Sequence, residues 1–204
     1  MYTPVVPVEK LTPERRRQQT RDVLIAAATE VFARRGFEGA SLEEIAETAG
    51  FTRGAIYKNF DGKEDLFFAV IDLLNEQVIE AFRAIAAESA TPSEWDISRL
   101  AELWRASVSE SELFAMGKEY ELYVLRNPDA RPRAVAHHRK QRQLVAAFIA
   151  EVAEHSGMTL RLPAVTLAGI ILAAADGLTY SARIDGDDLF APFLELLNAG
   201  MIAD

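Results

Sequence analysis

Residues 53–60 hold the side chains best suited to contact nucleic acid. Arg53 is the residue type that binds the O6 and N7 atoms of guanine with two hydrogen bonds. Gly54 has no side chain, so DNA can approach the backbone closely there. The Tyr57 hydroxyl and the Lys63 ammonium are placed to contact phosphates. We predict a DNA-contacting set of Ser41, Thr52, Arg53, Gly54, Ala55, Tyr57, Lys58 and Lys63.

Two short helices must position this set. Ser41 and Glu44 have the spacing of a capping box, which predicts a helix over 42–49. Gly50-Phe51-Thr52 then turns the chain into a second helix over 53–60, whose Ile56 and Phe60 face inward. This spacing over 41–60 predicts a helix-turn-helix with its second helix in the major groove. The alternative for the pattern alone is a solvated helix face with ordinary helix punctuation.

The rest of the chain predicts helices only. Thr12-Pro13-Glu14 begins a helix that stops at Gly36, and Lys63 opens a long helix. Apolar periodicity continues through 97–127, 129–155, 164–184 and 187–202, while alternating strand patterns are absent from the sequence. We predict an all-α fold of about nine helices. Its parts are a flexible arm (1–11), a three-helix DNA-binding domain (12–62) and a larger helical domain (63–204).

The charge distribution permits a polyanion partner. The chain of 204 residues has a net charge of −9. Residues 1–66 account for −1 of this charge and residues 67–204 for −8, so the acidity lies mainly outside the predicted DNA-binding region. A local basic region can still bind phosphates, because distant charges are screened beyond about 8 Å.

Composition and motifs limit the other functions. The sequence has no Cys, which excludes thiol nucleophiles and cysteine zinc sites and fits a cytoplasmic protein. The N-terminus lacks the pattern of a secretory signal, and the longest apolar run, 164–175, is shorter than a membrane span. Nucleophile, phosphate-loop and metal-binding motifs are missing from the sequence. We therefore expect a protein that is not an enzyme and has no cofactor and no metal.

The run from Arg16 to Leu66 resembles the DNA-binding domain of the TetR family of bacterial transcriptional regulators. The matches include the Ala-rich first helix, Gly36-Phe37, Ala49-Gly50 and Ile56-Tyr57 at fixed spacing. Lys58-Asn59-Phe60 departs from the ending frequent in that family, which leaves the base preference open. The resemblance implies a homodimer on palindromic operator DNA, with a C-terminal domain that receives a small molecule and then releases the DNA.

Two apolar regions of the C-terminal part could form the dimer interface and the ligand pocket. The helices over 164–184 and 187–202 predict either an internal core or, as we favour, a dimer interface of Val165, Ile171, Leu172, Phe190, Phe193 and Leu197. Aromatic residues on the middle helices predict either plain core or a pocket for an apolar or aromatic ligand. The residues predicted for that pocket are Trp104, Phe114, Tyr120, Tyr123, His137, Phe148, Asp176 and Tyr180.

Together these features predict a ligand-responsive, DNA-binding repressor. The alternatives are an all-α enzyme or small-molecule carrier that uses the C-terminal pocket, and a helical interaction module with no role on DNA. The helix that begins at Lys63 continues from one domain into the other, so we expect its tilt to couple ligand binding to DNA release.

Overall fold

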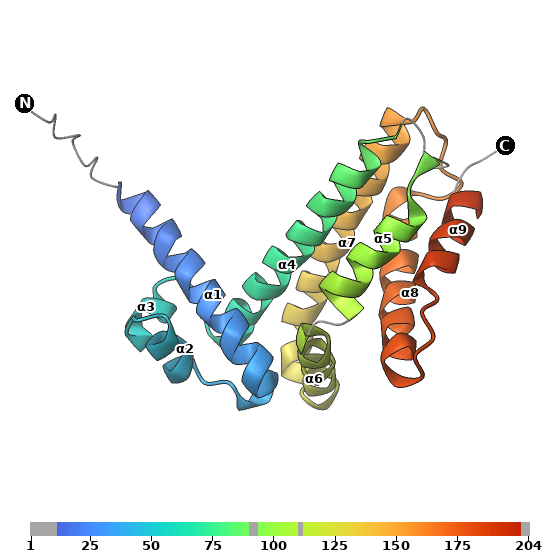
Figure 1. Ribbon diagram of the computed structural model, residues 1–204. Helices are drawn as coiled ribbons and strands as arrows, with labels where there is room; N and C mark the ends of the chain where they lie inside the picture. The colour runs from blue at the N-terminus through green and yellow to red at the C-terminus, as the bar shows by residue number, and fades with distance from the viewer. Residues whose placement is uncertain (1–11, 90–93, 110–111, 201–204) are drawn as a thin grey trace, which may run out of the picture. The chain divides into compact units, whose positions relative to one another are not determined.

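The computed structural model describes residues 12–89, 94–109 and 112–200, and within them the predicted all-α class is confirmed (Figure 1). The described residues form nine α-helices and no β-strand element. The predicted arm over 1–11 lies outside the described residues. The chain divides into two compact units, residues 1–70 and 71–204. Their boundary falls inside helix α4 (Lys63–Ala86).

Unit 1 packs α1 (Pro13–Gly39), α2 (Leu42–Thr48), α3 (Arg53–Tyr57) and the start of α4 around one aromatic cluster. The Phe67 ring meets the rings of Phe32 and Phe37 edge-on, at centroid distances of 5.6 and 5.0 Å. Leu24, Val31, Ile45, Ile56 and Leu66 of the same unit are completely buried. This core fixes the orientation of the short helix α3, which is too short to be stable alone.

The helices of unit 1 begin and end near the predicted capping and helix-breaking residues, with two differences. The Thr12 and Ser41 hydroxyls accept the amides of Arg15 and Glu44, as N-caps do. Gly36 has a φ of 72° and breaks α1, although a further turn continues to Gly39. Glu44 does not complete a reciprocal capping box, because its carboxylate accepts from the Arg34 and Arg35 guanidinium groups instead. The Arg34 hydrogen bond lowers the pKa of Glu44.

Unit 2 contains the rest of α4 and five further α-helices (Figure 1). These are α5 (Ile97–Trp104), α6 (Glu112–Arg126), α7 (Arg131–His155), α8 (Ala164–Ile184) and α9 (Phe190–Gly200). A π-helical turn over Arg105–Ser109 follows α5, and a 3₁₀ turn over Pro128–Ala130 precedes α7. Helix α8 packs against α7, and α9 packs against α5.

A polar cluster joins α4 to α7 within unit 2. The carboxylate of Asp72 lies 3.0 Å from Nε2 of His137 and accepts a hydrogen bond from the Lys140 ammonium at 2.6 Å. Partial burial by itself would raise the pKa of Asp72, but the hydrogen bonds from His137 and Lys140 outweigh it and lower that pKa. The cluster therefore holds a charged carboxylate between two helices.

Helix α8 is apolar on both its inward and its outward face. Leu167, Ala168 and Ala175 are buried, whereas Ile170, Tyr180 and Ile184 point out of unit 2 and are about half exposed or more. By length and composition alone α8 could cross a membrane, contrary to the expectation from its shorter apolar run, but core helices of other proteins pass the same test. Only 22% of its most apolar stretch is buried within the chain.

Candidate functional site

Helices α2 and α3 and the turn between them form a helix-turn-helix in unit 1. Gly50 has a φ of 71°, which only glycine adopts without strain, and the amide of Phe51 donates to the Ala46 carbonyl at 2.8 Å. Ile56 and Phe60 are buried, as predicted. The opposite side of α3 is exposed to solvent. The local structure therefore presents one face of a five-residue helix outward.

Arg53 stands at the start of this outward face within a small polar network. Its guanidinium bonds to the Glu43 carboxylate on α2 and donates to the Tyr57 hydroxyl at 2.9 Å. The guanidinium carbon also lies 5.4 Å from the Tyr57 ring centroid. Both Arg53 and Tyr57 are about half exposed, so the network orients the arginine while leaving it accessible. Glu43, which the sequence argument left out, is the partner that holds it.

The other predicted DNA contacts differ in accessibility. Ser41, Thr52, Gly54 and Lys58 are exposed, whereas Ala55 is half-buried. Thr52 stands at the N-cap of α3 but its hydroxyl makes no capping hydrogen bond. A Cβ atom added at Gly54 would meet only the Thr52 hydroxyl, at 3.7 Å, so the packing of this chain does not itself require a glycine there. An approaching partner is one reason for a small residue at this position.

Lys63 performs a structural task that the sequence argument did not foresee. Its ammonium donates to the backbone carbonyls of Glu38 and Ala40, at 3.2 and 3.1 Å, and lies 4.8 Å from the Phe37 ring centroid. Partial burial lowers its pKa. Two of its three N–H donors therefore stabilise the end of α1 and the loop before α2, and a phosphate could meet only the remaining donor.

Two arginines of α1, also missed at the sequence level, hold the C-terminal end of α3. Arg21 donates to the Asn59 carbonyl at 2.8 Å and lies over the Phe60 ring, 4.2 Å from its centroid. Arg17 donates to the Lys58 carbonyl at 3.3 Å. The Asn59 side-chain amide turns back to donate to the Ala55 carbonyl at 2.8 Å. These contacts complete the short helix and fix its angle against α1.

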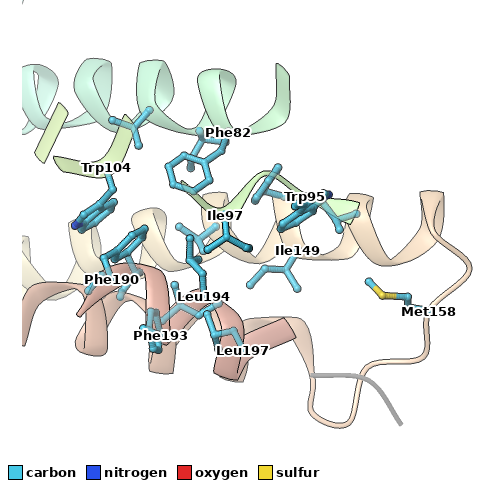
Figure 2. A pocket seen from close by; sticks show the side chains of 18 residues that line it. Phe82, Trp95, Ile97, Trp104, Ile149, Met158, Phe190, Phe193, Leu194 and Leu197 are labelled. Atoms are coloured by element: carbon cyan, nitrogen blue, oxygen red, sulfur yellow. The ribbon is translucent and has the colours of Figure 1, made fainter. Parts of the chain in front are cut away.

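Unit 2 contains a partly open apolar cavity of about 160 Å³ between α4, α5, α7, α8 and α9 (Figure 2). Trp104 stacks on Phe190 at one end of it, with a centroid distance of 4.6 Å and an interplanar angle of 6°. The Trp104 indole N–H donates to the buried Thr179 hydroxyl at 3.2 Å. No charged or amide side chain is among the described residues that line the cavity, so its walls can offer a guest mainly dispersion and hydrophobic contact.

Only two residues of the predicted ligand pocket, Trp104 and Phe148, line this cavity. The other six do not line it and have other surroundings. His137 binds Asp72, Asp176 pairs with Lys118 on the surface, and Tyr180 is exposed. Phe114 lies near the Lys118 and Arg183 cations, and the Tyr120 and Tyr123 rings adjoin each other. The cavity is lined instead by aliphatic residues and by Phe82, Trp95, Phe190 and Phe193.

The predicted dimer residues also lie mostly inside the protomer. Ile171, Leu172, Phe190, Phe193 and Leu197 line the cavity, and Phe190 is only 5% exposed. Val165 alone among the six is an exposed apolar side chain. The outward stripe of α8 runs instead through Thr166, Ile170, Ala173, Gly177, Tyr180 and Ile184.

The sequence of this chain matches known proteins over part of its length. The family model of the bacterial regulatory proteins of the tetR family matches residues 24–70. HTH-type transcriptional regulator TtgR of Pseudomonas putida is 44% identical over 71 residues, which are 35% of this chain and 34% of that protein. HTH-type transcriptional repressor BepR of Brucella suis is 47% identical over 53 residues, or 26% and 25% of the two chains. The chain thus matches about a third or less of the length of these relatives.

Comparison of structures extends over nearly the whole chain. The fatty acid degradation regulator FadR from Bacillus halodurans has a TM-score of 0.63 and covers 94% of this chain and 98% of its own, at 21% identity. At that identity the likeness establishes the fold and not the ligand. The matched helix-turn-helix, its exposed α3 and the shared all-α fold agree with one another. Over residues 24–70, the chain carries the N-terminal domain of the tetR family of bacterial regulatory proteins.

Proposed function

We propose that the protein is a cytoplasmic repressor that binds palindromic operator DNA as a homodimer and is released by a small apolar or aromatic ligand. The proposal that the protein binds DNA rests on the outward face of α3. It presents Arg53, Gly54, Tyr57 and Lys58, while Ile56 on the opposite side is buried. Such a helix can enter the major groove with its first residues against base edges.

A second copy of the chain is the proposed cover for the outer face of α8. Its outward stripe combines the large apolar side chains Ile170, Tyr180 and Ile184 with the small residues Ala173 and Gly177. A Cβ atom added at Gly177 would meet nothing within 4 Å, so this part of the helix is open to close approach. A two-fold axis would place the same stripe from each copy in contact and bury the exposed apolar area.

The effector is proposed to occupy the cavity of unit 2. A cavity of about 150 Å³ with aliphatic and aromatic walls stays dry and accepts a benzene-sized guest. The cavity of about 160 Å³ in this chain is therefore large enough for an aromatic ring or a short branched chain. Asp176 and His137, predicted from the sequence as pocket residues, do not line the cavity and take no part in this proposal.

Helix α4 supplies the proposed connection between effector and operator. Its Val78, Ile79 and Phe82 line the cavity, and its Leu66 and Phe67 belong to the core of unit 1. A ligand that fits one position of α4 better shifts the population towards that position. A coupling free energy of about 1–3 kcal/mol would change operator affinity about 5- to 150-fold.

Footprinting and mobility-shift assays on DNA from the protein's own promoter test the DNA-binding half. A protected palindrome is the expected result. Failure to protect any promoter DNA, together with turnover or carriage of a small molecule, would favour the all-α enzyme or carrier instead. The effector half is tested by measuring ligand affinity with and without operator, because coupling is reciprocal. Equal affinities would exclude allosteric release.

A further inference from the structure

Arg53 is held from two sides within the helix-turn-helix. Its Nη1 group bonds to the carboxylate of Glu43, in the first turn of α2. Its Nη2 group donates to the Tyr57 hydroxyl, one turn further along α3, at 2.9 Å. The two partners stand on different helices, which contact each other within unit 1. The direction of the guanidinium is therefore set by the placement of α2 as well as by the arginine's own helix.

The network leaves Arg53 enough donors to read a base. A guanidinium has five N–H groups, and Glu43 and Tyr57 engage one each. The remaining three exceed the two that a paired contact with O6 and N7 of guanine takes. The Arg53 side chain is 54% exposed, so these groups can be reached from solvent. Arg53 can thus contact guanine without leaving Glu43.

Three carboxylates of α2 differ in their surroundings. Glu43 pairs with Arg53, whereas the neighbouring Glu44 turns to α1 and accepts from Arg34 and Arg35. Glu47 is exposed four residues beyond Glu43, so it lies on the same face of the helix. Glu43 and Glu47 therefore carry equal charges on one face of α2, and only Glu43 belongs to the Arg53 network.

The Glu43 carboxylate changes what Arg53 binds well. A lone guanidinium attracts every phosphate of the DNA, and such contacts carry no sequence information. A carboxylate beside it cancels much of that attraction, because the ion pair has no net charge. A base edge is uncharged and is bound by directed hydrogen bonds, which depend on the orientation of the donors. Pairing therefore weakens a contact with phosphate more than a contact with guanine.

We propose that Glu43 is a positioning residue that sets the sequence discrimination of this helix-turn-helix. It holds Arg53 in one direction and reduces the attraction of Arg53 for phosphate. This inference rests on the proposed function, because it assumes that α3 contacts operator DNA. Specificity is a difference between two affinities, and it improves when binding to the wrong partner is weakened. Glu43 thus acts against unrelated DNA as well as for the operator.

Selection from a library of randomised DNA duplexes tests the proposal with the full chain. The wild type is expected to enrich guanine at one position of each half-site, and Arg53→Ala should lose that preference. Glu43→Ala should reduce the same preference about fivefold or more, because a paired contact with a base contributes at least that much discrimination. It should also bind a scrambled duplex more tightly than the wild type, with a salt slope steeper by about 0.9 for each protomer.

Glu43→Gln separates the charge of Glu43 from its hydrogen bond. Glutamine can still accept from Arg53 but carries no charge. This variant should keep most of the guanine preference, yet bind the scrambled duplex as tightly as Glu43→Ala does. If it binds the scrambled duplex no more tightly than the wild type, the charge of Glu43 does not act against unrelated DNA and the proposal is overturned.

Glu47→Ala is the matched control, since it removes the same charge from the same face of α2 without touching the Arg53 network. It should leave the guanine preference unchanged. In the Arg53→Ala background, Glu43→Ala should reduce that preference no further, because both residues act through one contact. An equal loss in Glu47→Ala, an additive loss in the double variant, or an unchanged preference in Glu43→Ala would overturn the role of Glu43.

A purely structural role would give a different pattern. If Glu43 only stabilised α2 against α3, Glu43→Ala would weaken binding to the selected and the scrambled duplex alike and keep the order of base preference, which would overturn the proposal. The wild type distinguishes this inference from the proposed function. A wild type that enriches no sequence refutes the proposed function and this inference with it. A wild type that enriches a half-site, with Glu43→Ala indistinguishable from it, refutes only the role of Glu43.

Discussion

Neighbouring isoleucines on α8 allow the proposed dimer to be tested separately from the protomer's core. Ile170 points outward and is 48% exposed, whereas Ile171 lines the cavity. Complete burial of an isoleucine side chain is worth about 1.5–3 kcal/mol. About half of that remains to be gained at Ile170, or about 1 kcal/mol for each copy. Ile170→Ala should therefore weaken a two-fold dimer by about 2 kcal/mol, which corresponds to a roughly 30-fold increase in its dissociation constant.

Ile171→Ala is the matched control, because it makes the same chemical change one residue away. It enlarges the cavity and should lower the free energy of unfolding by up to about 2–5 kcal/mol, less to the extent that Ile171 is only half-buried. Its effect on the dimer's dissociation constant should be small. The pair thus separates loss of association from loss of folding stability.

Sedimentation equilibrium over a range of concentrations measures the dimer, and chemical denaturation measures the unfolding of each variant. The reasoning is refuted if Ile170→Ala leaves the dissociation constant unchanged while Ile171→Ala raises it. A wild-type chain that stays monomeric at micromolar concentration would refute the dimer itself.

Four further substitutions test unit 1 and the polar cluster of unit 2. Arg53→Ala should weaken operator binding by about 1–3 kcal/mol and relax the preference at one base pair. Fluorescence anisotropy with single-base operator variants measures both effects. If neither changes, Arg53 does not read a base. Lys63→Met should lower the free energy of unfolding, measured by chemical denaturation, by about 1–3 kcal/mol, because the Glu38 and Ala40 carbonyls lose their donor. Unchanged stability together with a smaller salt dependence of DNA binding would instead identify Lys63 as a phosphate contact. Arg21→Met should weaken binding to all operator variants alike, because it loosens α3 without removing a base contact; a changed order of preference would contradict this. Asp72→Asn should lower the thermal midpoint at pH 7. The gap to the wild type should narrow as the pH falls below about 4 and through the lowered pKa of Asp72, because a carboxyl with a lowered pKa stabilises the fold above its unfolded pKa and loses that effect as it is protonated. A gap that does not narrow at all with falling pH would argue for a packing effect.

Local signals in the sequence predicted the helix starts well. Thr12 and Ser41 cap their helices through hydrogen bonds from amides only three residues further along the chain, so the signal is local. The far end of α3 was harder to predict. Its length depends on Arg17 and Arg21, which lie about forty residues earlier and meet it only in the folded unit.

The cavity and the outward stripe of α8 could not be assigned from the sequence, because both depend on helix orientation. A helix that is apolar all round has no polar face to set its rotation. Ile170 and Ile171 are therefore equivalent in the sequence, although one is exposed and the other lines the cavity. Aromatic residues were equally uninformative: Trp104 lines the cavity, whereas Tyr180 lies on the surface.

The two-sided character of α8 bears on how this protein could change by mutation. Ile171, Leu172 and Ala175 on its inner side line the cavity, and they are interleaved along the chain with outward positions such as Ile170 and Ala173. If the cavity holds the effector and the outward stripe contacts a second copy, as proposed, single substitutions would alter effector preference without altering self-association, and the reverse. An insertion or deletion of one residue within α8 would rotate one half of the helix by about 100° and exchange the two sets of positions. A lineage carrying this helix would thus be free to diversify by substitution but not by changes of length in this segment.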